Sequence, residues 1–497
     1  MPTFHFNGEN TLTDAASIDC FNGKSKQYGQ CVALVNVDID DEGNASRRDG
    51  STPVLPDVVT SGWSNGDKAY CVKTNRLHSF DGTALTIRDA DLAVDAVCEF
   101  EEVNDVVVFS DDIIIGIIEQ NGTVTRIDRP ADWVGVENLE QWLADHAPAD
   151  PAKWDGVTSN SNFEVDAYKL ATLAGNCLHF FAGVLYLAID NFVYATNAMD
   201  VEHMDIRYCV VAGFPGAVTM ISHVDDGLFI GTTGGTYFLP GTGVVVSEKG
   251  DMVSAFNQRQ VDKFPAIKGT AVRISADHLP ALQTQGIVTL WATRQGIMAG
   301  VGGGGVVNLS ADKVTLPDVA SGCACFRETA GVRQYLVSLG DEVRVLNTYT
   351  LAPSRYLGYQ FDSLFVLAGS TYGTPATGIY RLTGERDGHR NNAYVDAYIL
   401  TPVTNFGSRM VAFLEALYLN ARCEGDMAVD YYVNEQLRYE DDTIGFNDDA
   451  NARERRARPP RGLRGNYWQF KLRNVDGTRF TAFGLEPVVA KSKNRTS

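Results

Sequence analysis

The sequence predicts an all-β fold, with a β-propeller of about seven blades followed by a C-terminal antiparallel β-sandwich. Short apolar runs bounded by Gly, Asp and Asn recur every few dozen residues from about residue 66, which is typical of radially repeated small sheets. The chain has 47 glycines and 10% aromatic residues, which suits many tight turns between short strands. Its 497 residues exceed one ordinary core, so several domains or one repetitive architecture must divide them.

Residues 1–62 are expected to form an N-terminal arm with a β-hairpin. Apolar and polar residues alternate ahead of the turn DDEGN and less clearly after it, which indicates two short strands around a turn. The sequence leaves open whether this hairpin stands alone or closes the propeller by pairing with the last blade.

The same stretch nearly matches a calcium-binding loop, with a glycine at the sixth position and a carboxylate at the twelfth. The residues concerned are Asp38, Asp40, Glu42, Gly43 and Asp49. The final ligand is Asp rather than Glu, two arginines fall inside the loop, and the flanks are strand-like rather than helical. These departures favour a solvated β-turn, and calcium binding stays an open alternative.

Residues 63–388 are expected to hold the blades. Each copy is an apolar strand, a turn, a second strand with Leu-Tyr or Val-Phe alternation, another turn and a third strand. The copies begin at Ala69, Cys98, Cys177, Ala217, Val288, Cys323 and Ser363. Six or eight blades also fit this spacing, because the fifth copy has a long preamble and the seventh is short.

Residues from about 132 to 165 break the strand pattern. Leu139, Trp142 and Leu143 fall at helical spacing in a stretch rich in Ala and acidic residues, which predicts a short helical insertion between the second and third blades. Such an insertion is a surface decoration or a docking element for a partner subunit.

Residues 389–497 are expected to form the C-terminal β-sandwich. The strands here are longer than those of the blades, and short blade hairpins are not evident. Val429, Tyr431 and Val433 alternate within one turn-bounded strand, which predicts a sheet with one buried face.

Charge and cysteine content exclude some partners and environments. The balance of 42 basic and 62 acidic residues gives a net charge of -20, which disfavours tight binding of nucleic acid by counterion release. The nine cysteines lie mostly in apolar runs, as expected for buried free thiols in a reducing compartment, and Cys323 and Cys325 should share one face of a strand. The chain shows no signal peptide and no membrane-spanning run, so we expect assembly in a host cytoplasm and no membrane insertion.

No pattern of catalytic residues stands out. The eight histidines are scattered without metal-ligand spacing, and hydrolase motifs are absent. The run from Gly302 to Gly305 lacks the Lys-Ser/Thr of a phosphate-binding loop and is interpreted as a hairpin turn. We therefore expect no enzyme activity, no catalytic residue, no metal and no cofactor.

An arginine cluster, NARERRARPPRGLRG, stands out in this acidic chain. Its arginines, predicted to be subunit-interface residues, are Arg453, Arg455, Arg456, Arg458, Arg461 and Arg464. Pro459 and Pro460 exclude a continuous helix, and we expect a loop between two strands. The alternatives are a solvated loop, a patch that docks on an acidic surface of a neighbouring subunit, and DNA contact.

Several strings resemble the tail nozzle or hub proteins of short-tailed bacteriophages. They are NVDIDDEGNASRRDG, WATRQGIMAGVGGGGVVNLS, GCACFRETAGVRQYLVSL, GIYRLTGERDGHRNNAYVDAYILTPVTNFGS and RGLRGNYWQFKLRNVDGTRFTAFGLEP. The resemblance implies a structural virion protein that forms a ring, usually a homohexamer, below the portal and adaptor and around the channel through which the DNA is ejected. It also implies contacts with adaptor, fibre or needle proteins and no cofactor.

The sequence thus predicts a viral tail structural protein whose acidic lumen lets genomic DNA pass without sequence-specific binding. The alternative is a carbohydrate- or receptor-binding β-propeller on a phage tail or cell surface, in which exposed Tyr237 or Trp291 would stack on sugars. Both aromatic residues also fit the core of a blade.

Overall fold

The computed structural model shows an all-β protein. It describes residues 6–18, 25, 27–89, 92, 96–127, 169–205, 209–241, 244–246, 252–254, 257–329, 331–407, 411–446, 448–460 and 462–491. Within these residues the only helical elements are 3-10 turns, so the all-β prediction is confirmed. None of their helices is long and apolar enough to cross a membrane. The predicted helical insertion at about 132–165 lies outside the described residues.

Seven antiparallel units of four strands, numbered as the first to seventh sheets, follow one another along the chain; six are separate sheets, and the sixth in order is part of a nine-stranded sheet. The first consists of β5 (Ser61–Ser64), β6 (Ala69–Lys73), β7 (Arg76–Phe80) and β8 (Leu85–Asp89). The second consists of β9 (Glu99–Val103), β10 (Val106–Ser110), β11 (Ile115–Ile118) and β12 (Val124–Ile127). The third consists of β14 (Cys177–Phe181), β15 (Val184–Ile189), β16 (Phe192–Ala195) and β18 (Val210–Gly213). The next two consist of β19 (Val218–Val224), β20 (Gly227–Thr232), β21 (Gly235–Pro240) and β24 (Arg259–Asp262); and β25 (Val272–Ser275), β26 (Ile287–Thr293), β27 (Gly296–Val301) and β28 (Gly305–Asn308).

The sixth and seventh sheets take in strands from elsewhere in the chain. The sixth begins with β29 (Cys323–Thr329), β30 (Val332–Leu339), β31 (Glu342–Asn347) and β32 (Ala352–Leu357), and the seventh consists of β33 (Ser363–Leu367), β34 (Ser370–Thr374), β35 (Ile379–Arg381) and β4 (Thr52–Leu55). The N-terminal strand β4 is therefore the fourth strand of the last sheet, where Leu55 lies opposite Ile379.

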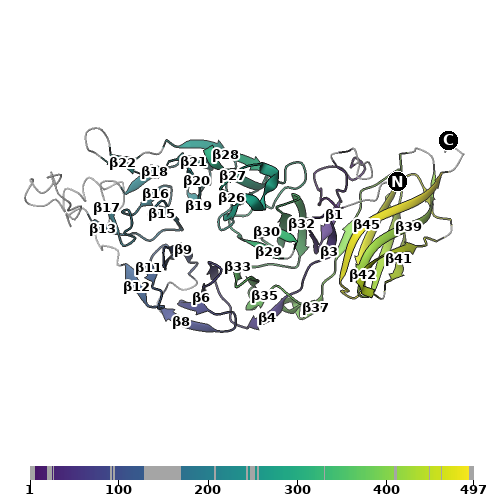
Figure 1. The fold of residues 1–497 in the computed structure, drawn as a ribbon, viewed down its shortest axis with the longest axis horizontal. Coiled ribbons are helices and arrows are strands. Elements are labelled where there is room, and N and C mark those ends of the chain that lie inside the picture. Colours follow the sequence, from purple (N-terminus) through teal and green to yellow (C-terminus); the bar gives the residue numbers. More distant parts are fainter. Residues whose placement is uncertain are drawn as a thin grey trace, which may run out of the picture.

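The seven sheets lie around a common centre (Figure 1). The first strand of each sheet is innermost, and the first and seventh sheets meet where the Gly62 amide donates to the Ser363 hydroxyl at 2.9 Å. Two sheets begin one strand earlier than predicted, at Ser61 and at Val272. The strand at Ser61 has little apolar content, and 3-10 turns separate the strand at Val272 from the next, so neither strand carries a clear pattern.

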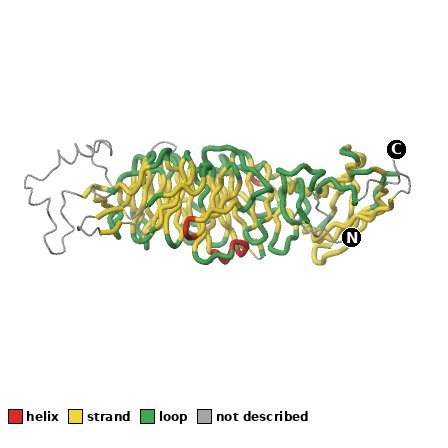
Figure 2. The backbone as a smooth tube through the Cα atoms, turned by 90° about the horizontal axis from the view of Figure 1, so that it is seen from above, coloured by secondary structure: helices red, strands yellow, loops and turns green. Residues whose placement is uncertain are grey.

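One end of the long axis holds the rest of the sixth sheet and one further sheet that faces it (Figures 1 and 2). The sixth sheet continues through β1 (Ala33–Val35), β38 (Tyr398–Leu400), β44 (Trp468–Asn474), β40 (Asp426–Val433) and β41 (Gln436–Gly445), and has nine strands. The other sheet has the order β2 (Val37–Ile39), β3 (Ala45–Arg47), β45 (Phe480–Lys491), β39 (Ala412–Cys423) and β42 (Asp448–Ala457), with β43 (Arg464–Gly465) beside β39.

One apolar core joins the five added strands of the nine-stranded sheet to the other sheet. It includes the fully buried Leu417, Trp468 and Phe470, and residues of the N-terminal strands such as Leu34 and Val37. Burying large apolar side chains between two sheets supplies most of the favourable free energy of such a unit. Residues 33–47 therefore pack with residues 398–491 although hundreds of residues separate them in sequence.

Short elements complete the described structure. Three two-stranded sheets pair β13 (Lys169–Ala171) with β17 (His203–Asp205), β22 (Val244–Val246) with β23 (Met252–Ser254), and β36 (Arg386–Asp387) with β37 (Ala393–Tyr394). The 3-10 turns are η4 (Ala276–His278), η5 (Pro280–Leu282), η6 (Gly302–Gly304) and η7 (Gly388–Arg390).

Candidate functional site

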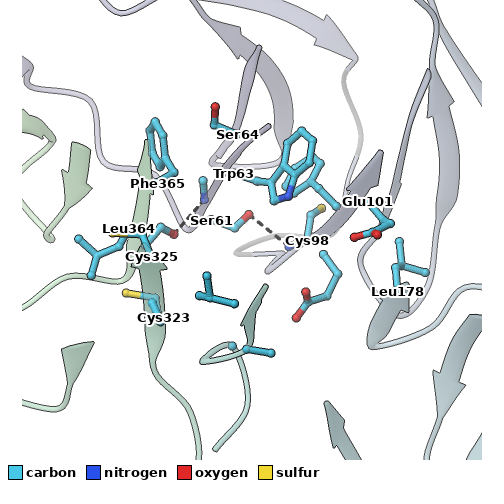
Figure 3. A pocket seen from close by; sticks show the side chains of 18 of the residues that line it. Ser61, Trp63, Ser64, Cys98, Glu101, Leu178, Cys323, Cys325, Leu364 and Phe365 are labelled. Carbon is cyan, nitrogen blue, oxygen red and sulfur yellow. Dashed lines mark hydrogen bonds between the residues drawn. The ribbon is translucent and has the colours of Figure 1, made fainter. Parts of the chain in front are cut away.

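The innermost strands of the seven sheets line a cavity of about 620 Å³ (Figure 3). Residues in or next to the first strand of every one of the seven sheets line the wall. The cavity is therefore formed by all seven sheets together. Hydroxyl groups join neighbouring sheets at this wall, where the Cys98 amide donates to the Ser61 hydroxyl at 3.2 Å. The wall also carries a carboxylate, Glu101, which is 8% exposed.

Glu101 belongs to a network of four ionisable side chains from the second to the fifth sheets. His179 Nε2 lies 2.7 Å from His223 Nδ1, and Arg273 Nη1 lies 3.1 Å from the same His223 nitrogen. Arg273 Nη2 donates to Glu101 Oε1 at 3.3 Å, and the Phe180 amide donates to the same oxygen at 3.2 Å. The network therefore ties four successive innermost strands together.

The donors in this network determine its protonation. A guanidinium can only donate, so His223 Nδ1 must accept and its ring is neutral, while His179 donates through Nε2. Burial and the charge of Arg273 lower the pKa of His223 to about 4. Burial, Arg273 and His223 lower the pKa of His179 well below its usual value. Burial raises the pKa of Glu101, and Arg273 opposes that rise.

Acidification should weaken the fold through these two histidines. The unfolded chain takes up protons near pH 6.5 while the folded state does not, so stability falls as the pH drops below that value. The raised pKa of Glu101 has the opposite effect on stability as the pH drops. The contribution of the histidines is therefore measured by comparing wild type with a double variant, His179→Gln and His223→Asn. This variant keeps a hydrogen-bond donor at the first position and an acceptor at the second. Between pH 7 and pH 5, wild type should lose on the order of 1 kcal/mol more than this variant.

Urea unfolding at both pH values measures the difference. His203→Gln is the matched control, because His203 lies at the surface beside Asp200 and outside the network. Equal pH dependence of wild type and the double variant would show that the buried histidines do not resist protonation.

Sequence reasoning missed this network because its members are far apart in the chain. His179 and His223 are 44 residues apart and show no metal-ligand spacing. Both lie on innermost strands of neighbouring sheets, so aligning the repeats against one another would have suggested their contact. Among the described residues, no group of three or more His, Cys, Asp or Glu is placed to hold a metal ion.

The described cysteines are free and buried, as predicted. Cys323 and Cys325 lie on the same face of β29 beside the cavity (Figure 3). Burial raises the pKa of Cys325 to about 12, so its thiol is protonated and poorly reactive at neutral pH.

The glycine run that was compared with a phosphate-binding loop and the acidic stretch that was compared with a calcium loop both form turns. Gly302–Gly304 connects β27 to β28, with the Gly303 amide donating to Asp226 at 2.7 Å. In the hairpin between β2 and β3, Asp40 Oδ1 accepts from the amides of Glu42 and Asn44 at 2.9 and 2.8 Å.

The other carboxylate of the calcium-like pattern faces a different part of the molecule. Asp38 accepts a hydrogen bond from Gln334 at 2.8 Å and one from the Tyr356 hydroxyl, both on the sixth sheet. Asp38 and Asp40 are therefore each engaged by separate protein groups.

The expectation that the arginine cluster forms a loop was wrong. Arg453, Arg455 and Arg456 lie in β42, where Arg456 pairs with Tyr418 and Arg453 with Ala421 of β39. The long strand β39 offers backbone hydrogen bonds that a solvated loop lacks, and arginine is tolerated at a sheet edge because its charge reaches water.

The remaining arginines follow the strand. Arg458 comes directly after β42, ahead of the two prolines that end it, Arg464 lies in β43 opposite Phe413, and Arg461 is outside the described residues. Arg453, Arg456, Arg458 and Arg464 are exposed. Arg455 is partly buried and donates to the Phe446 carbonyl at 3.4 Å.

The aromatic residues considered for sugar stacking are buried. Trp291 is 0% exposed and Tyr237 is 9% exposed. Neither ring offers a free face to a carbohydrate.

Neither a scan of protein-family models nor a search of curated proteins found a match. Among solved structures, the chain is similar to PorZ, a surface component of the type-IX secretion system of Porphyromonas gingivalis, with 12% identity and a TM-score of 0.38. That match covers 70% of this chain and 42% of the PorZ chain. The computationally designed Ika8 protein matches at 10% identity and a TM-score of 0.35, over 68% of this chain and 99% of its own. The AfRom2 CNH domain matches at 7% identity and a TM-score of 0.37, over 67% and 97%.

Proposed function

We propose that the seven four-stranded units form a seven-bladed β-propeller, and that the last five strands of the nine-stranded sheet form a β-sandwich with the six-stranded sheet. The propeller is supported by the cavity that the innermost strands surround. It is also supported by the N-terminal strand β4, which pairs with β35 of the last sheet. Such pairing between the first and last strands of a series of blades closes the circle of sheets. The core shared by the two facing sheets supports the sandwich.

The function we propose is structural: the chain is a virion protein that forms an oligomeric ring, the nozzle or hub of a short-tailed phage tail, around the channel for DNA ejection. This proposal rests on the way in which the proposed propeller and sandwich are joined. A single sheet of nine strands crosses it through β1, where Val35 pairs with both Arg355 and Tyr398. A continuous hydrogen-bonded sheet resists bending between the parts, as a channel wall requires.

A buried ion pair reinforces the same junction. Arg48 donates two hydrogen bonds to Asp387, each of 2.8 Å, and both side chains are at most 1% exposed. The net charge of -20 supports a wall past which DNA slides without being held. The partners of such a ring are further copies of the chain, the portal and adaptor, and fibre or needle proteins.

Ring formation is tested by measuring the mass of the purified chain in solution. We expect particles of several 54.2 kDa copies by light scattering near neutral pH, or assembly when purified portal and adaptor complexes are added. Electron micrographs of these particles should show closed rings, with six copies as the expected order. A chain that stays monomeric and binds neither complex would contradict the proposal.

The carbohydrate-binding alternative has no supporting observation in the site. Its two candidate aromatic residues, Tyr237 and Trp291, are core residues of the fourth and fifth sheets. A glycan array that returned strong selective binding would restore it.

A further inference from the structure

Two strand edges lie side by side in the C-terminal part of the chain. β41 is the last strand of the nine-stranded sheet and β42 is the last strand of the six-stranded sheet. Among the described residues, no strand pairs with the outer side of either. The chain passes from Gly445 at the end of β41 to Asp448 at the start of β42, so the two strands run antiparallel next to each other. Unpaired edges present free backbone groups to another strand, and proteins normally cover or protect them.

The first half of β41 lacks the cover that a strand in two facing sheets normally has. All six residues from Gln436 to Asp441 are exposed, although side chains alternate between the two faces of a strand. They include two large apolar side chains, Leu437 at 46% and Tyr439 at 40% exposure. Exposed apolar side chains on an unpaired edge favour contact with another chain.

The two edges carry opposite charges. β41 contains three acidic residues and one basic residue, whereas residues 451–458, on and just after β42, contain four arginines and one glutamate. Within the described part of the chain, no opposite charge comes within ion-pair distance of Glu440, Arg456 or Arg458. These charges are therefore available to a partner of opposite sign.

A second copy of the chain fits both edges at once. A two-fold axis that runs along the strands, between β41 and β42, places β41 of the other copy against β42 and β42 of the other copy against β41. Because β41 and β42 are antiparallel within one copy, both new pairs are antiparallel as well. This rotation leaves positions along the strands unchanged, so the exposed residues 436–441 come level with residues 452–457 of the other copy.

We propose that two copies of the chain associate through the edges of β41 and β42, so that the acidic edge of each copy pairs with the basic edge of the other. The contact uses the same surface on both copies, so it is isologous and closes as a dimer. Opposite charges fix its register and disfavour the pairing of β42 with β42. The dimer does not rest on the proposed ring, because a two-fold contact alone cannot generate a ring of six copies.

Charge reversal on each edge tests the contact. The β42 variant carries Arg456→Glu and Arg458→Glu, and the β41 variant carries Glu440→Arg. Asp441 is kept because it pairs with Arg473. Each variant alone brings like charges together at both strand pairs, and we expect it to dimerise at least about 10-fold more weakly than wild type. In an equimolar mixture, a mixed dimer regains opposite charges at both pairs, so association should return, and this return also shows that both variants are folded.

Dimerisation of the isolated full chain is measured by analytical ultracentrifugation, where wild type should reach twice the 54.2 kDa of one chain. Backbone amide exchange of wild type gives a second readout that needs no variant, since the amides of β41 and β42 should exchange more slowly at concentrations at which the dimer forms. The matched control carries Arg76→Glu and Arg381→Glu, a similar change of charge at exposed positions of the first and seventh sheets, and should dimerise like wild type.

The outcomes separate this inference from the proposed function. Wild type that stays monomeric alone and forms rings with portal and adaptor overturns the dimer and leaves the ring intact. A wild-type dimer in which amide exchange of β41 and β42 is unchanged overturns the inference, and so do variants that dimerise as tightly as wild type. Dimers that form as expected but never give rings, alone or with portal and adaptor, contradict only the proposed function.

Discussion

Replacing Asp387 with alanine is expected to lower the free energy of unfolding by about 3–5 kcal/mol. Arg48 would keep its charge in a site where it is 1% exposed and would lose both hydrogen bonds to the carboxylate. The Tyr359 ring, whose centre lies 3.7 Å from the guanidinium carbon, offers only partial compensation. Because the pair lies between the N-terminal strands and the last sheets, we expect the loss to affect both parts of the molecule.

Thermal and urea unfolding of the isolated chain measure this effect. The matched control is Asp318→Ala, which removes the surface partner of Arg294, 3.9 Å away with side chains 58% and 83% exposed. An exposed pair of this kind contributes at most about 1 kcal/mol. If the two variants lost equal stability, the buried Arg48–Asp387 pair would not reinforce the junction as proposed.

Replacing Trp291 with alanine should cost about 3–5 kcal/mol through the cavity it leaves. The indole is 0% exposed and lies 5.5 Å, centre to centre, from the Phe229 ring of the neighbouring sheet. Gly300 sits directly against both rings, since a Cβ there would come within 2.9 Å of the indole and 2.7 Å of Phe229. The three residues thus close the space between the fourth and fifth sheets.

Unfolding experiments on Trp291→Ala and Trp291→Phe separate packing from a surface role. We expect the phenylalanine variant to be intermediate, because it fills part of the volume. Met199→Ala is the control, since Met199 is 68% exposed and should change stability by less than about 0.5 kcal/mol. Unchanged stability in Trp291→Ala, with loss of binding to a glycan, would favour the carbohydrate-binding alternative instead.

Local patterns were sufficient for much of the fold. The alternation at Val429, Tyr431 and Val433 predicted side chains that are indeed buried, at 0%, 0% and 2% exposure. The C-x-C pair at Cys323 and Cys325 likewise shares one face, because side chains alternate along any strand. Such features depend on neighbours within one strand or hairpin, so a single sequence is enough to predict them.

The arginine cluster shows where local patterns mislead. Six arginines and two prolines in a short stretch are typical of a loop, yet Arg453, Arg455 and Arg456 lie in a strand. The partner that makes them a strand is β39, about 35 residues earlier, and a sequence pattern carries no information on which distant strand is available for pairing. The candidate interface residues could be named from the sequence, while their arrangement along one sheet edge could not.

The sequence by itself determined the all-β class, the positions of most hairpins and the buried state of the cysteines, because turn chemistry and alternation act over a few residues. The tertiary structure alone decided that β4 joins the last sheet, that one sheet of nine strands joins the ring of sheets to the C-terminal strands, and that His179 contacts His223 between two neighbouring sheets. Each of these depends on contacts between residues far apart in the chain, which form only when whole sheets pack around a common centre and bury their apolar faces together.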